Sequence, residues 1–263
     1  MSELGDDTTV VRSAQGWTGA ISPRWNVGSA PHGGYLLALA ARAMLQAGKR
    51  TDPLTVTAHF VKPPEPGPVT VATEVARAGR RYTTVAAALR QGAAERVRLL
   101  GALGELGGQR GPTRVAAAPP PIPPPEDCVT LGGSSAPEVA GRFDFRFPED
   151  SPWVVRAGAP PHGEPLEVTG WIRLADGSDP STLALLVFSD AFPPTVLSMR
   201  HVGWVPTIEL TVHVRARPAP GWVLGTFRTR FLIDGLMEED GELWGQDGRL
   251  LAHTRQLAVV LER

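Results

Sequence analysis

The chain has 263 residues, of which 42% are hydrophobic and 20% charged, and 26 Lys and Arg stand against 27 Asp and Glu. This composition excludes a disordered chain, and a net charge of −1 gives no electrostatic case for binding nucleic acid or an anionic membrane. The single cysteine, Cys128, excludes an intrachain disulfide framework and a cysteine-based zinc site. The acidic N-terminus lacks the features of a signal peptide, and no apolar run approaches the ~20 residues that span a bilayer, so we expect a cytoplasmic protein without a membrane partner.

The first half of the chain contains a predicted buried helix that begins at Gly33-Gly34. The segment that follows is rich in Ala and Leu, poor in β-branched residues and apolar on nearly every side, and it ends near Gly48. Alternating runs rich in β-formers come next, separated by turns that contain Pro, Gly or charged residues, which predicts an antiparallel meander. The predicted strands are 54–61, 69–78, 82–91 and 96–106.

The middle of the chain is rich in proline. Residues 119–125 read PPPIPPP, a sequence that favours extended polyproline II and cannot continue a helix or a central strand. We expect residues 111–165 to connect two units, residues 1–110 and residues 166–263, although a long surface loop within one domain would have the same composition.

The second half repeats the order of elements seen in the first. A short strand at 170–174 precedes a predicted helix at 180–188, and further strands are predicted at 208–217, 222–233, 237–244 and 250–261. Two landmarks also recur at one offset. His213 follows His59 by 154 residues, and Pro220-Gly221 follows Pro66-Gly67 by the same number. The shared order and offset favour an internal duplication.

A helix followed by a bent antiparallel sheet, occurring twice in one chain, predicts an α+β fold. In the simplest arrangement each sheet wraps around its own long apolar helix and the two sheets join edge to edge. This is the double hotdog fold, with two tandem hotdog repeats. An α+β protein with two independent domains fits the same pattern.

The sequence lacks the common catalytic motifs. It has no phosphate-binding loop, no dinucleotide-binding glycine motif, no HExxH and no GxSxG, and its six histidines do not cluster at metal-ligand spacing, so we expect no metal and no cofactor. Three polar residues in apolar surroundings remain. Asp190 ends the predicted second helix, where the helix dipole disfavours a carboxylate, Thr207 begins a strand, and Gln256 lies within the last strand. From the pattern alone, Asp190 can equally be a solvated helix-end residue and Gln256 an exposed residue.

At these residues the chain resembles the acyl-CoA thioesterase II (TesB-type) proteins of the thioesterase-like superfamily, whose members have the double hotdog fold. The resemblance covers most of the chain and is weakest at the N-terminus and between about residues 107 and 165. It is carried by Gly33-Gly34 with the apolar helix, HFVKPPEPGPVTV, Ser189-Asp190, PTIE at 206–209 and the terminal hairpin GELWGQDGRLLAHTRQLAVV.

The resemblance implies a hydrolase of lipid metabolism that cleaves a fatty-acyl-CoA to the free acid and CoA. An acyl carrier protein is the other thiol carrier that it allows. It further implies that Asp190, Thr207 and Gln256 hold the hydrolytic water, with Asp190 as general base. Glu209-Leu210 and His213 replace an Asp-His pair and a Trp of the family, which leaves the shape of the acyl pocket open.

The start of the first helix is the candidate oxyanion site. Free N–H groups of Gly33 and Gly34 at a helix N-terminus suit a developing negative charge, and His32 beside them is a candidate substrate contact. A helix-entry turn that needs glycine, preceded by a capping residue, explains the same sequence.

Two other functions fit the pattern. A non-catalytic hotdog protein that binds acyl thioesters or a protein partner would keep the same fold. A hotdog hydratase or dehydratase is disfavoured, because no catalytic Asp/His or His/Glu pair matches here. A double hotdog already contains a two-fold pairing, and further assembly into a homo-oligomer is left open.

Overall fold

The computed structural model describes residues 2–107, 111–130, 138–155, 158–160, 163–199 and 202–261. The elements of the first half are α1 (Glu3–Asp7), β1 (Val11–Ser13), β2 (Gly16–Ile21), the 3₁₀ turn η1 (Pro23–Trp25), β3 (Asn26–Val27), β4 (Ala30–Pro31), α2 (Gly33–Gly48), β5 (Asp52–Phe60), β6 (Gly67–Ala78), β7 (Thr83–Gln91) and β8 (Ala94–Gly104). The elements that follow are η2 (Pro125–Asp127), η3 (Glu138–Arg142), β9 (Phe143–Arg146), α3 (Pro152–Val155), β10 (Leu166–Leu174), α4 (Thr182–Phe188), η4 (Thr195–Ser198), β11 (Thr207–Val214), β12 (Val223–Ile233), β13 (Leu236–Gly245) and β14 (Leu250–Val259).

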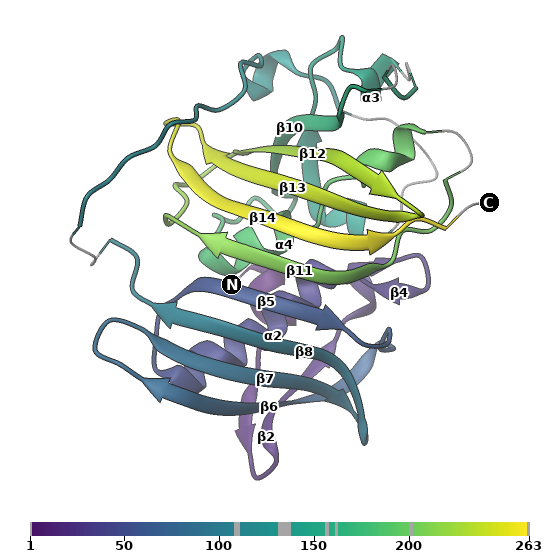
Figure 1. The fold of residues 1–263 in the computed structure, drawn as a ribbon. Helices are drawn as coiled ribbons and strands as arrows, with labels where there is room; N and C mark the ends of the chain where they lie inside the picture. Colours follow the sequence, from purple (N-terminus) through teal and green to yellow (C-terminus); the bar gives the residue numbers. More distant parts are fainter. Residues whose placement is uncertain are drawn as a thin grey trace.

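One antiparallel sheet runs through the whole molecule. Its strand order is β1-β2-β6-β7-β8-β5-β11-β14-β13-β12-β10-β9, and β5 and β11 join the two halves. The order β2-β6-β7-β8-β5 in the first half is mirrored by β10-β12-β13-β14-β11 in the second, with the sheet curved around α2 and α4 (Figure 1). The predicted double hotdog fold is confirmed. The alternative of two independent domains is wrong, because the hydrogen bonding of the sheet continues across β5 and β11.

The two helices form the centre of the core. α2 is rich in Ala and Leu, and nearly all of its side chains are buried against the sheet and α4, as its apolar sequence predicted. It ends at Lys49, whose left-handed conformation (φ 52°) stops the helix. α4 is shorter, and every side chain from Thr182 to Phe188 is buried. No helix in the described part of the chain is long and apolar enough to cross a bilayer.

The proline-rich segment lies against the second repeat. The Trp171 indole N–H donates to the Pro123 carbonyl at 2.9 Å, and Ile122 packs on a small cluster that contains Trp171 and Trp244. The segment is therefore attached to the second repeat through the Ile122 side chain and the Pro123 carbonyl. Within the predicted connector 111–165, residues 131–137, 156–157 and 161–162 lie outside the described residues.

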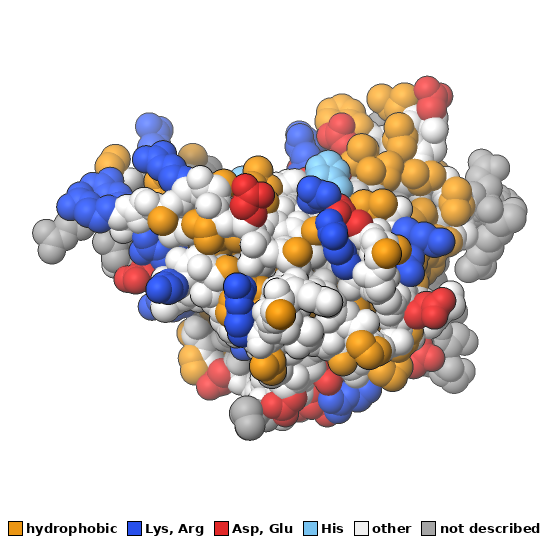
Figure 2. Space-filling view, turned by 90° about the horizontal axis from the view of Figure 1, so that it is seen from below, with side chains coloured by type: hydrophobic (Ala, Val, Ile, Leu, Met, Phe, Trp, Pro, Cys, Tyr) orange, Lys and Arg blue, Asp and Glu red, His pale blue; other side chains and the backbone are white. Residues whose placement is uncertain are grey.

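Charged side chains are mixed over the end of the molecule formed by the first repeat. Figure 2 shows basic and acidic groups across this face, with the basic groups densest at its left edge. Arg77, Arg80 and Arg81, at the β6–β7 hairpin of this repeat, line a shallow depression.

Candidate active site

Asp190 lies where the end of α4 meets the beginning of α2. The two helices pack antiparallel, so the residue that follows α4 faces the N-terminus of α2, and Asp190 Oδ2 accepts the Gly34 N–H at 2.7 Å. The positive end of the α2 dipole stabilises this carboxylate and offsets the unfavourable end of α4. A carboxylate that is misplaced with respect to its own helix is thus bound by the neighbouring one.

Glycine is required where α2 begins. A Cβ on Gly34 would lie 2.9 Å from the carbonyl oxygens of Leu186 and Val187, and one on Gly33 would lie 2.9 Å from Asp190 Oδ2. The bare backbone therefore lets the carboxylate reach the helix terminus. Gly34 uses its N–H on Asp190, whereas the N–H of Gly33 has no hydrogen-bond acceptor among the described residues.

His32 holds both helices at this point. Its Nδ1 accepts the Tyr35 N–H at 3.2 Å and so caps α2, while its Nε2 lies 2.7 Å from the Asp190 carbonyl oxygen and 3.4 Å from Oδ2. Because Nδ1 accepts a hydrogen bond, these partners assign the ring hydrogen to Nε2, which donates to Asp190. The His32 side chain is only 5% exposed and both ring nitrogens have protein partners, so the geometry favours positioning of Asp190 over direct substrate contact.

Thr207 and Gln256 meet on the inner face of the second repeat. Thr207 begins β11 and Gln256 lies in β14, and the Thr207 hydroxyl donates to Gln256 Oε1 at 3.0 Å. Gln256 is buried, so its interpretation as an exposed strand residue is wrong.

Behind Gln256 lies a carboxyl group that the sequence analysis missed. Glu239 stands opposite Gln256 on β13 and is 3% exposed, and its Oε1 accepts Gln256 Nε2–H at 2.8 Å. Its Oε2 accepts from the backbone N–H of Thr195 at 2.9 Å and from the Thr195 hydroxyl at 2.8 Å. Burial raises the pKa of Glu239 above its ordinary value, although these three donors oppose the rise.

The alternation of β13 could have revealed Glu239. Met237, Glu239, Gly241 and Leu243 occupy the inward positions of the strand. In the sequence, Glu238-Glu239-Asp240 resembles a run of solvated charges, and this concealed the buried member.

The candidate residues thus form two groups. Gly34 and His32 bind Asp190, whereas Thr207 binds Gln256. Within the described residues no direct hydrogen bond joins the two groups. The negative charge of Asp190 nevertheless contributes to the raised pKa of Glu239, so the second group lies within the electrostatic reach of the first.

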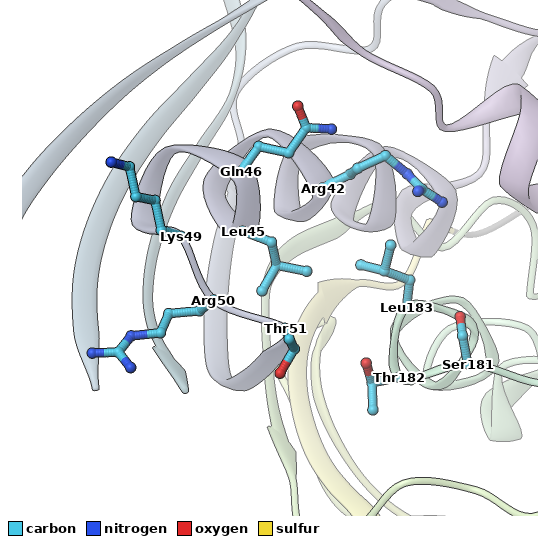
Figure 3. Close-up of a pocket in the computed structure, with 9 residues that line it drawn as sticks. All are labelled: Arg42, Leu45, Gln46, Lys49, Arg50, Thr51, Ser181, Thr182 and Leu183. Atoms are coloured by element: carbon cyan, nitrogen blue, oxygen red, sulfur yellow. The ribbon is translucent and has the colours of Figure 1, made fainter. Parts of the chain in front are cut away.

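The opposite end of the helix pair differs in chemistry. There α2 ends beside the start of α4, and a cavity of about 460 Å³ is lined by residues that include Leu45, Thr51, Thr182 and Leu183 (Figure 3). Lys49 and Arg50 also border it, but their side chains point away from α4 in Figure 3.

Strand register identifies the counterparts of the polar group at that end. Gly101 faces Val85 and Val56 in the first repeat as Gln256 faces Glu239 and Leu210 in the second. Likewise, Pro53 faces Leu103 where Thr207 faces Ala258. The counterparts of Thr207, Glu239 and Gln256 are therefore Pro53, Val85 and Gly101, which carry no polar side chain.

Comparison with known proteins identifies the same fold. The family described as "Acyl-CoA thioesterase N-terminal domain" matches residues 21–104, and "Acyl-CoA thioesterase C-terminal domain" matches residues 116–260. A solved protein of Thermobifida fusca YX, described as a candidate thioesterase II, is 31% identical over 100% of this chain and 98% of its own, with a TM-score of 0.90.

Two more distant structures share the fold. A hot dog protein of unknown function from Alicyclobacillus acidocaldarius is 21% identical over 100% of this chain and 99% of its own, with a TM-score of 0.87. Acyl-CoA thioesterase II TesB2 from Mycobacterium marinum is 18% identical over 99% of this chain and 98% of its own, with a TM-score of 0.77.

Proposed function

The chain belongs to the acyl-CoA thioesterase family, and we propose that it hydrolyses an acyl-CoA to the free acid and CoA by direct attack of water. Family and fold indicate a thioester hydrolase. We propose in addition that the substrate is a CoA thioester and that the residues described above act on it.

Asp190 is the general base. In this mechanism the water donates one hydrogen to the Asp190 carboxylate and the other to the Thr207 hydroxyl oxygen, which leaves a lone pair for the carbonyl carbon. As the water oxygen attacks, Asp190 takes its proton and the carbonyl oxygen becomes an oxyanion. Collapse of this intermediate breaks the carbon–sulfur bond, and the departing thiolate receives the proton from Asp190.

The oxyanion is assigned to the N-terminus of α2. The Gly33 N–H lies at the positive end of the helix dipole, beside the carboxylate that activates the water. Gly34 has a different role, since its N–H holds Asp190. Base and oxyanion donor are thus adjacent at one helix terminus, as attack of a bound water on a carbonyl requires.

The observation that carries the proposal is the anchoring of Asp190. Its Oδ2 accepts the Gly34 N–H and its backbone carbonyl accepts His32 Nε2–H, so the first repeat holds both the side chain and the backbone of Asp190. A carboxylate placed in this way against a helix N-terminus has a defined direction, which a solvated helix-end residue would not have.

The test is release of free thiol from acyl-CoAs of several chain lengths, followed with a chromogenic thiol reagent, for wild type and Asp190→Asn. Asparagine keeps an oxygen for the Gly34 N–H but cannot take a proton. We expect wild-type turnover to fall by about 100-fold or more in the variant. Asp179→Asn is the matched control, because Asp179 is exposed at the other end of α4, and it should retain full activity.

Each outcome separates the candidate functions. Turnover that survives Asp190→Asn would refute the mechanism but keep the hydrolase. A folded wild-type protein that releases no thiol from acyl-CoA or from an acyl carrier protein thioester would favour the binding protein. The protein's own thiol interferes little with the assay, because Cys128 is buried and its burial raises the pKa of the thiol.

A further inference from the structure

We propose that Glu239 is a positioning residue that fixes the direction of the hydrogen bond between Thr207 and Gln256, in which the Thr207 hydroxyl donates, and through it the orientation of the attacking water. The inference rests on the proposed function and extends it to a residue that does not touch the substrate. It follows from the donors and acceptors along the hydrogen-bonded chain of Thr195, Glu239, Gln256 and Thr207, of which the first three are buried.

The first link is the anchoring of Glu239. The Thr195 backbone N–H can only donate, and with the Thr195 hydroxyl it occupies Oε2 at 2.9 and 2.8 Å. Glu239 Oε1 is left to face Gln256 at 2.8 Å. The three hydrogen bonds that Glu239 accepts favour its ionised form, and an ionised carboxylate can only accept, so the Gln256 amide turns its NH₂ group toward Glu239.

The second link is the orientation of Gln256. With its NH₂ group on Glu239, its carbonyl oxygen faces Thr207, and the Thr207 hydroxyl spends its only hydrogen on that oxygen at 3.0 Å. The Thr207 oxygen then offers lone pairs alone to a water molecule. The water must donate to Thr207, which directs its own lone pair away from Thr207 and toward an acyl carbon.

Burial makes this arrangement strict. Glu239 and Gln256 are 3% and 7% exposed, so two donors that faced each other at this position could not form hydrogen bonds with bulk water instead. An unmet hydrogen-bonding group in such a place is costly, and the network therefore has one preferred direction.

The test begins with Glu239→Gln, which preserves the shape of the side chain and replaces one acceptor oxygen by an NH₂ donor. The new amide must keep its oxygen on the Thr195 N–H, so its NH₂ group faces the NH₂ group of Gln256. Gln256 then turns over and donates to Thr207, whose hydrogen is released toward the water. We expect kcat to fall by about 10- to 100-fold with KM within about twofold of wild type.

A reciprocal swap supplies the rescue. In the double variant Glu239→Gln/Gln256→Glu, the amide at 239 donates to the carboxylate at 256, and that carboxylate again accepts from Thr207. We expect the swap to recover at least about tenfold in kcat over Glu239→Gln. Gln256→Glu alone places two carboxyl groups against each other and should stay poorly active. Glu238→Gln is the matched control, because Glu238 lies on the outer side of the same strand beside Arg255 and should leave kcat unchanged.

Melting temperatures show whether each variant is folded, and the Asp190→Asn variant tests the proposed function separately. If Glu239→Gln is folded and its kcat lies within twofold of wild type while Asp190→Asn is inactive, this inference fails and the proposed function stands. If Asp190→Asn is active, the proposed mechanism itself fails. If Glu239→Gln does not fold, the swap decides, since a folded swap without activity overturns the inference and an active one supports it.

Discussion

Thr57 and Thr211 lie directly opposite each other where the two repeats join, with their hydroxyl oxygens 2.8 Å apart. They are separated by 154 residues, as are His59 and His213. A residue faces its own equivalent across a two-fold axis only where the axis passes between them. The pseudo-two-fold axis of the chain therefore passes between these threonines, and the offset found in the sequence is the one that relates the repeats in space.

The close contact between α2 and the end of α4 predicts the effect of Gly34→Ala. The new methyl group would lie 2.9 Å from the Leu186 and Val187 carbonyls and from Asp190 Cβ, so the helices must separate and the base must move. We expect a loss of about 2 kcal/mol in the free energy of unfolding, measured by urea denaturation, together with a large drop in kcat. In Gly141→Ala the added methyl group meets no atom within 4 Å, and this control should behave as wild type. Wild-type activity in Gly34→Ala would contradict the assigned packing.

The two ring nitrogens of His32 can be tested separately. His32→Asn offers an oxygen to the Tyr35 N–H in place of Nδ1 but cannot reach Asp190, whereas His32→Gln places an amide near Asp190 and is a poor cap. We expect kcat to fall about tenfold in His32→Asn and to be better preserved in His32→Gln. His32→Gln should instead lose about 1 kcal/mol of stability with the cap. Equal loss of activity in both would show that His32 acts through the fold alone.

An ion pair between the repeats, in which Asp52 is buried and Arg217 is exposed, predicts how stability depends on pH. Burial alone would raise the pKa of Asp52, but hydrogen bonds from Arg217, the Leu106 N–H and Thr51 outweigh it and lower the pKa below 3.8. The folded protein thus binds this proton more weakly than the unfolded chain, so the stabilisation is present above pH 3.8 and is lost as the pH falls through the lowered pKa.

Asp52→Asn tests this dependence. We expect it to lower the free energy of unfolding by about 2 kcal/mol at pH 7. The difference from wild type should shrink as the pH falls below the pKa of a free aspartate side chain. Thermal melts between pH 7 and pH 3 measure the effect, with Asp179→Asn as control. A difference that is constant over this range would rule out the charge as its source.

The main helices and strands could be predicted from the sequence because their patterns are strong. α2 is apolar all round, and the strands from β5 to β8 and from β10 to β14 alternate between clear turns. The short elements β1 to β4 and β9 were not predicted, since a strand of two to six residues carries too little pattern.

The site could be predicted only in part. Asp190, Thr207 and Gln256 were predicted through resemblance and stay a prediction, whereas the helix dipole argued against Asp190, because the sequence does not show that α2 begins beside the end of α4. Glu239 was missed because its neighbours on the strand are also acidic. In both cases the decisive partner comes from another element, which local pattern does not record.

The proposed site takes residues from both repeats, and this limits how far the chain can be shortened. His32, Gly33 and Gly34 come from the first repeat, and Asp190, Thr207 and Gln256 come from the second. At the opposite end of the helix pair, Pro53 and Gly101, the counterparts of Thr207 and Gln256, carry no polar side chain. Neither repeat holds all the residues of the proposed site, so on the proposed mechanism two copies of either one would not replace the whole chain. Because both repeats lie in one chain, the two ends of the helix pair can carry different side chains although the strand order of the sheet is symmetric.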